Sequence, residues 1–191
     1  MVIAVTAILA VYTATPALQE FLVLPKGEAF TELWLLGPGH MTENYPYNIT
    51  SGQSYDVFLG VFNHLGNVAC YSIQVKIRNQ IQPEPNSMEH NSSNLPVLFN
   101  LYAVVADNES WELPVRFGFD YYYDSAQSKV VYTKFLFNDK VLTLSGYSTS
   151  WDTSRSSFFA NLIFELSVYD RGTGSFQYHE RYVDLKFNMT I

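Results

Sequence analysis

Hydrophobic and polar residues alternate with a period of two over much of the chain beyond residue 28. The clearest example is YSIQVKIRN, whose two alternating sets are Tyr71, Ile73, Val75 and Ile77, and Ser72, Gln74, Lys76 and Arg78. Successive side chains of a β-strand point to opposite faces of a sheet. The pattern therefore predicts a strand with the first set in a core and the second set in water.

Two further runs, WELPVRFGF (111–119) and YVDLKFNMT (182–190), alternate in the same way. Pro114 cannot donate a ladder hydrogen bond, so the first of these strands is expected at an edge or with a bulge there. The second run places Lys186 and Asn188 on its wet face. The runs 54–63 and 161–169 are partly apolar on both faces and predict central or covered strands. Shorter candidates are 29–36, 97–105, 129–137 and 140–144.

Turn residues separate these runs, and no amphipathic helical stretch is evident. Residues 79–96 lack periodicity, carry early prolines and are expected to form a long exposed loop. Residues 147–157 are a second polar connection. About seven to nine short strands joined by turns predict an all-β fold, an antiparallel immunoglobulin-like β-sandwich. We expect this domain at 29–191, after a hydrophobic N-terminal segment at 1–28.

The net charge of the chain narrows the classes of molecule that it is expected to bind. The 191 residues carry a formal net charge of −7, only 15% of them are charged, and no cluster of Lys and Arg occurs. Nucleic acids and anionic membrane surfaces are bound by basic patches, so neither is an expected partner. The chain has one cysteine, which excludes an intramolecular disulfide.

Four Asn-x-Ser/Thr sequons indicate where the protein is located. They begin at Asn48, Asn91, Asn108 and Asn188. Each is a potential acceptor for a covalent N-glycan, and four in a chain of this length favour an exported protein. We therefore expect an extracellular, cell-surface glycoprotein.

Catalytic patterns are absent from the sequence. The four histidines form no zinc-binding motif, and there is no nucleophile elbow or phosphate loop. No catalytic residue, metal or cofactor is expected, and the protein is not expected to be an enzyme. Tyr121, Tyr122 and Tyr123 form the one aromatic cluster, interpreted as a packing or adhesive surface. An isopeptide cross-link needs a buried lysine, and is not expected because Lys76 and Lys186 are predicted to point outward.

The N-terminal segment MVIAVTAILAVYTATPALQEFLVL is uncharged up to Glu20 and has three interpretations. A secretory signal peptide should begin with basic residues, which are missing. A membrane anchor needs about 20 apolar residues, and the run 2–18 nearly reaches this length although Pro16 interrupts it. A strand that inserts into a neighbouring copy fits the β-branched, alternating composition. Its interaction residues would be Val2, Ile3, Val5, Ala7, Leu9 and Val11.

Residues 30–77 resemble an archaeal family of membrane-anchored surface proteins that is described only as a domain of unknown function. The matching positions are Phe30, Thr31, Glu32, Leu35, Gly37, Pro38, Tyr45, Pro46, Asn48, Thr50, Gly52, Asn63 and His64. The resemblance implies an extracytoplasmic immunoglobulin-like domain, usually attached to membrane helices. It implies no catalytic activity.

Two functions follow from these expectations. The first is a structural subunit of a glycosylated surface filament, a homopolymer in which residues 2–13 of one copy enter the next copy. Archaeal thread-like pili are similar in this respect. The alternative is a membrane-anchored cell-surface ectodomain of unknown function in an archaeal envelope complex, with the membrane as a partner only if the N-terminus is an anchor.

Overall fold

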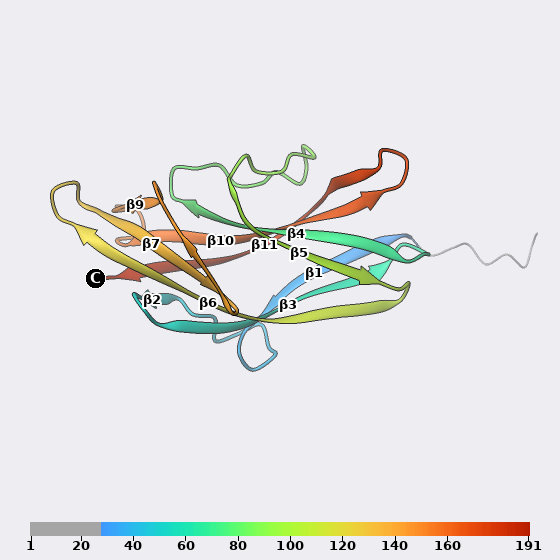
Figure 1. Cartoon of the computed structure of the whole chain (residues 1–191), viewed down its shortest axis with the longest axis horizontal. Helices are drawn as coiled ribbons and strands as arrows, with labels where there is room; N and C mark the ends of the chain where they lie inside the picture. Colours follow the sequence, from blue (N-terminus) through green and yellow to red (C-terminus); the bar gives the residue numbers. More distant parts are fainter. Residues whose placement is uncertain (1–27) are drawn as a thin grey trace, which may run out of the picture. The chain divides into compact units, whose positions relative to one another are not determined.

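The computed structural model describes residues 28–191, and Thr31–Ile191 form one compact unit. They fold as the predicted antiparallel immunoglobulin-like β-sandwich (Figure 1). The strands are β1 (Phe30–Leu36), β2 (Asn48–Thr50), β3 (Ser54–His64), β4 (Ala69–Asn79), β5 (Val97–Val105), β6 (Glu109–Asp124), β7 (Lys129–Phe137), β8 (Lys140–Thr143), β9 (Ser148–Ser150), β10 (Phe158–Asp170) and β11 (Ser175–Thr190). The described residues contain no helix that could span a membrane.

Two sheets face each other. Sheet A has the order β1-β3-β6-β7-β8, with β9 also paired to β7, and sheet B has the order β2-β11-β10-β4-β5. The long strands pair antiparallel, while β2 and β11 pair parallel over three residues. Hairpins such as β10–β11 keep neighbours in sequence adjacent in space, which is the usual connection in sandwiches of this kind.

The alternation predicts the inner faces correctly. Tyr71, Ile73, Val75 and Ile77 of β4 are buried, as are Val115, Phe117 and Phe119 of β6. Strand β10, predicted to be central or covered, lies between β11 and β4 and is buried from Phe158 to Ser167. Aromatic rings fill the space between the sheets, for example Phe119 with its centroid 4.8 Å from that of Phe135.

The outer face of β4 is buried in part, whereas the sequence predicted that it is exposed to water. Ser72 and Lys76 were expected in water, but their exposed fractions are only 3% and 2%. The segment at 79–96 was expected to form a long exposed loop, and two of its residues, Ser93 and Leu95, are buried. Backbone and side-chain atoms of Ser93 bond to Lys76 on β4 and Glu165 on β10, so part of the loop covers this face of sheet B.

Pro114 lies in a strand that is central in the sheet but locally unpaired on one side. Strand β6 pairs with β3 along Glu109–Gly118, whereas its pairing with β7 begins only at Phe117. The backbone N–H of Arg116 points to the β7 side, where it donates to Asn138 Oδ1 at 2.8 Å. Pro114, two residues earlier, has its missing N–H on that same open side. Pro114 was predicted to lie at a sheet edge or a bulge, and it lies where the central strand β6 has no partner on its β7 side.

Two other expectations are refined. The polar connection at 147–157 contains the short strand β9, in which Thr149 is buried and donates to Phe159 O at 2.7 Å. Asn188 was placed on a wet face, but its side chain is half-buried and its Oδ1 atom has no hydrogen-bond partner among residues 28–191. Strand β2 pairs with that part of β11, and Asn188 N donates to Tyr47 O at 2.8 Å.

Candidate functional site

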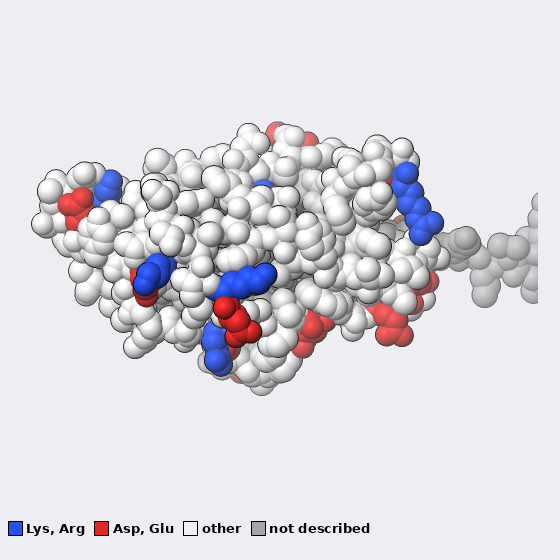
Figure 2. Space-filling model, in the orientation of Figure 1, with Lys and Arg blue, Asp and Glu red and all other residues white. Residues whose placement is uncertain are grey.

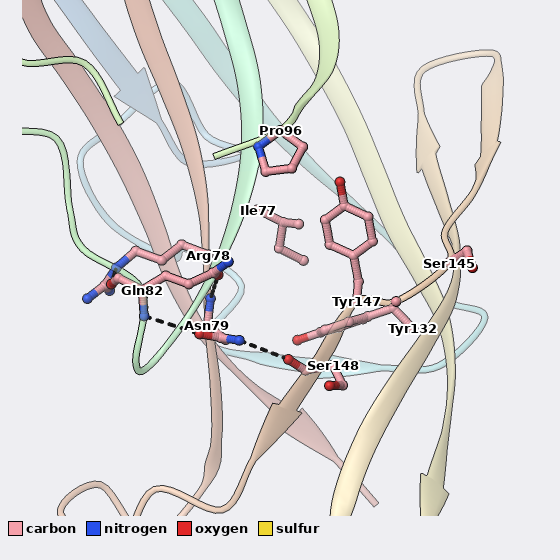
Figure 3. A pocket seen from close by; sticks show the side chains of 10 residues that line it. Ile77, Arg78, Asn79, Gln82, Pro96, Tyr132, Ser145, Tyr147 and Ser148 are labelled. Atoms are coloured by element: carbon pink, nitrogen blue, oxygen red, sulfur yellow. Dashed lines mark hydrogen bonds between the residues drawn. The ribbon is translucent and has the colours of Figure 1, made fainter. Parts of the chain in front are cut away.

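A pocket of about 310 Å³ opens between the end of β4, the loop that follows it, and the residues of β7 and of the segment that leads into β9 (Figure 3). Four separate segments build it: the end of β4, the loop at 79–96, strand β7 and the residues that lead into β9. Its lining is Ile77, Arg78, Asn79, Gln82, Pro96, Tyr132, Ser145, Gly146, Tyr147 and Ser148. The volume is at the lower end of the range for sites that hold small molecules.

Tyr132 is the most unusual residue of this pocket. Its side chain is 2% exposed, and its hydroxyl has no hydrogen-bond partner among the described residues. Burial raises the pKa of the Tyr132 hydroxyl well above its ordinary value, so the group stays neutral and keeps its proton. In Figure 3 this hydroxyl is directed toward Asn79 and Ser148. A buried polar group without a partner is costly, which makes this one a candidate for ligand contact.

The polar groups around Tyr132 are held in place by the backbone. Asn79 Nδ2 donates to Ser148 O at 3.1 Å, and Asn79 N donates to Gln82 Oε1 at 2.9 Å. Tyr132 N donates to Tyr147 O at 3.0 Å, which fixes the aromatic pair relative to each other. These bonds join β4, β7 and β9 across the pocket and keep its walls in position.

The charge of the pocket is largely cancelled. Arg78 Nη1 lies 3.1 Å from Glu84 Oε1, and Arg78 Nε donates to Gln82 O at 2.5 Å. No carboxylate is among the lining residues. The arrangement offers hydroxyls, amides and aromatic surfaces to a small neutral molecule, and it has no paired nucleophile and base for catalysis.

A second feature is the open edge of β11. Among the described residues, the side of β11 away from β10 is paired only at Asn188–Thr190, with β2. Asn188 N donates to Tyr47 O at 2.8 Å, so the backbone groups of Lys186, Asp184 and Tyr182 point the same way. A groove of about 600 Å³ follows this edge, lined by Leu35, Tyr45, Tyr47, Tyr182, Val183, Asp184, Leu185 and Lys186. An open edge of this kind can accept an added strand.

The histidines do not come together. His40 lies 3.0 Å from Glu112, His90 contacts Glu180, and His64 contacts Asn108. His179 Nε2 lies 2.9 Å from Thr31 Oγ1 in a half-buried cluster. Across 28–191, no three His, Cys, Asp or Glu side chains are grouped closely enough to hold a metal ion. Figure 2 shows that the charges on one face are scattered and of both signs.

The burial of Lys76 removes the reason for which an isopeptide cross-link was not expected. Lys76 was expected to point outward, but its side chain is buried and Nζ lies 2.8 Å from Glu165 Oε2 and 3.0 Å from Ser93 O. The partners of Lys76 within 28–191 are therefore a glutamate and a serine, and no asparagine or aspartate bonds to it. Lys186 is exposed, as expected.

The tyrosine triplet is divided between two environments. The Tyr121 hydroxyl lies 2.7 Å from Ile49 O and 2.6 Å from Thr190 O, which connects β6 to the β2–β11 pair. Tyr122 and Tyr123 are exposed, and the Tyr123 ring lies 5.7 Å from that of Phe158. Only two of the three rings are therefore available to a partner.

Three sequon asparagines, Asn48, Asn91 and Asn108, are exposed, and Asn188 is half-buried. Asn48 and Asn188 lie directly opposite each other in the β2–β11 pair. The predicted interaction residues Val2, Ile3, Val5, Ala7, Leu9 and Val11 lie outside the described part of the chain.

Sequence reasoning missed the pocket at Tyr132. Its residues come from four distant segments, and no short motif connects them. The one local signal was the burial of Tyr132 in β7 two residues after Val130, before the pattern shifts by one residue to Phe135 and Phe137. Only the three-dimensional structure shows that its hydroxyl has no partner within residues 28–191.

Two solved structures are distantly similar to this fold. A β-glucosidase from Listeria innocua in complex with glucose matches 84% of the chain with 10% identity and a TM-score of 0.39. The CARDB domain of the PF1109 protein from Pyrococcus furiosus, in complex with di-metal ions, matches 87% of the chain and 93% of its own length, with 8% identity and a TM-score of 0.39. The chain spans only 16% of the β-glucosidase.

A search of curated proteins gave no significant match. A family model does match residues 24–155, which is more than half of the chain and includes strands β1 to β9. The protein belongs to the family described as "Domain of unknown function (DUF1616)".

Proposed function

We propose that this protein is a structural cell-surface domain that is held at the membrane by its N-terminal segment. The observation that carries the proposal is the filled core of the sandwich. Ile49, Leu59, Phe117, Phe164 and Phe187 are fully buried. These five side chains belong to one core cluster built from the described strands, which favours attachment through the N-terminal segment over donor-strand exchange.

The sequence of the N-terminal segment supports the same proposal. Residues 2–18 carry no charge and come close to the length of apolar chain that spans a bilayer. The family match begins at residue 24, after this run. The four sequons and the scarcity of charge agree with a glycosylated extracellular position.

The attachment can be tested by fractionation of cells that express the full chain. We expect the protein in the membrane fraction, resistant to alkaline carbonate and released by detergent. A variant that lacks residues 1–23 should be a soluble monomer with the same thermal midpoint, because the core is already complete. Leu9→Arg should reduce membrane association, and the apolar control Leu9→Phe should not. Full-length protein that is released by carbonate contradicts the anchor.

Filament assembly is a second proposal, favoured by the open edge of β11. Residues 2–13 of one copy would pair with Tyr182–Phe187 of the next, with apolar side chains against Leu35 and Tyr47. In that case negative-stain images of detergent-free protein should show fibres. Lys186→Pro should abolish the fibres, because the lost N–H faces the open side and not β10. Lys186→Ala is the matched control and should still assemble.

A further inference from the structure

Within residues 28–191, the Tyr132 hydroxyl is a buried side-chain atom without a hydrogen-bond partner, as are Ser157 Oγ, Asn161 Oδ1 and Asn188 Oδ1. The hydroxyl of Tyr71, which is also buried, lies 3.0 Å from Thr31 Oγ1 and donates to Asn63 Oδ1 at 3.0 Å. A phenylalanine would fill the space of Tyr132 equally well, beside the ring of Phe119 at a centroid distance of 5.6 Å. An unsatisfied buried hydroxyl costs stability, and such exceptions call for a specific explanation.

The surroundings of this hydroxyl indicate the chemistry of a ligand. Ile77, Pro96 and the Tyr147 ring provide apolar surface, and Gln82, Ser145 and Ser148 provide amide and hydroxyl groups at the rim. Arg78 is paired with Glu84, so the pocket holds no free charge for an anion. A pyranose ring has the complementary surface, with apolar C–H faces and a rim of hydroxyls.

We propose that the pocket at Tyr132 binds a single neutral hexose residue, either as a free sugar or as the terminal unit of a glycan. The ring would lie against Tyr147 and Ile77, and one sugar oxygen would accept the hydrogen bond of the Tyr132 hydroxyl. A ligand of this size in a half-open pocket should bind with a dissociation constant of about 1 mM. The proposal is independent of how the protein is attached to the cell.

The test uses the full chain, purified in a detergent that has no sugar headgroup. Thermal midpoints are measured with increasing D-glucose, D-galactose, D-mannose or N-acetylglucosamine, each free and as its methyl glycoside, and with inorganic phosphate. At least one hexose should raise the midpoint in a saturable manner, and phosphate should not. Binding of the methyl glycoside but not the free sugar would identify a glycan end as the ligand. The absence of any saturable hexose effect up to about 50 mM, fifty times the expected constant, would overturn the proposal.

Tyr132→Phe distinguishes a ligand contact from a structural hydroxyl. We expect this variant to have an unchanged or higher midpoint without sugar and about tenfold weaker sugar binding. Tyr169→Phe, on exposed β10 surface outside the pocket, should change neither. Two results would overturn the proposal: unchanged sugar binding in Tyr132→Phe, or a lower midpoint without sugar, which would show that the hydroxyl already has a partner such as a buried water.

Discussion

Lys76 Nζ and Glu165 Oε2 lie 2.8 Å apart on the outer face of sheet B, and both side chains are almost completely buried. Ser93 completes the cluster, since its backbone oxygen accepts from Lys76 at 3.0 Å and its hydroxyl and N–H bond to Glu165. The ion pair therefore holds the loop at 79–96 against β4 and β10. Burial of the two charges is tolerated because each one has several partners.

Removal of one partner of this pair should be strongly destabilising. We expect Lys76→Met or Glu165→Gln to lower the free energy of unfolding by about 3–5 kcal/mol, because the other group remains buried without its partner. The double variant Lys76→Met/Glu165→Leu should recover much of that loss. Urea denaturation measures all three. Lys134→Met, which breaks the exposed pair with Asp120, is the control and should cost about 0–1 kcal/mol.

The buried pair also marks the limit of what the sequence could predict. Alternation placed Tyr71 and Ile77 in the core correctly, because one face of every strand must meet the opposite sheet. It placed Lys76 in water, because no property of β4 itself reveals that the loop that follows it folds back over its second face. The loop at 79–96 has no periodicity, so its contacts with Glu165 could not be foreseen. The pocket at Tyr132 could not be predicted either, because its residues come from separate segments that meet only in the fold.

His179 should make stability depend on pH. Burial, and secondarily the positive charge of Arg181, lower its pKa below the ordinary value of 6.5, while Glu180 acts in the opposite direction. The unfolded chain then binds a proton more readily than the folded chain. Stability is complete above about pH 6.5 and is lost as the pH falls toward the lower pKa of the folded state.

The measurement is the thermal midpoint between about pH 7.5 and 5.5, the range in which histidine titrates. His179→Gln keeps a polar group near Thr31 and should have a smaller decrease across this range than the unmodified protein. His40→Gln, at an exposed pair with Glu112, should retain the full decrease. An identical decrease in His179→Gln would show that other groups cause the pH dependence.

Gly60 on β3 is required by the close approach of Trp34 on β1. A Cβ atom at position 60 would lie 2.1 Å from Trp34 Cε2, far inside van der Waals contact. We expect Gly60→Ala to cost about 1–3 kcal/mol through overpacking, as measured by urea denaturation. A Trp34→Leu background should reduce this cost. Gly39→Ala is the control, since nothing lies within 4 Å of its added Cβ; equal costs at the two positions would contradict the steric explanation.

Glycan occupancy should differ between the two sequons that face each other in β2 and β11. Asn48 is exposed, whereas Asn188 is half-buried with its Oδ1 inaccessible and unpaired within the described residues. In an exporting host that attaches N-glycans, we expect modification at Asn48, Asn91 and Asn108 and little at Asn188. Mass spectrometry of the glycopeptides measures each occupancy directly.

The variant Asn48→Gln separates two causes of low occupancy at Asn188. If burial of the Asn188 side chain in the fold is the cause, Asn188 stays unmodified when its neighbour is removed, and this is the result we expect. If the glycan on Asn48 only blocks access, occupancy at Asn188 rises in the variant. Occupancy at Asn188 equal to that at Asn91 in the unmodified protein would contradict both, because the Tyr47–Asn188 hydrogen bond holds β2 against this position in the fold.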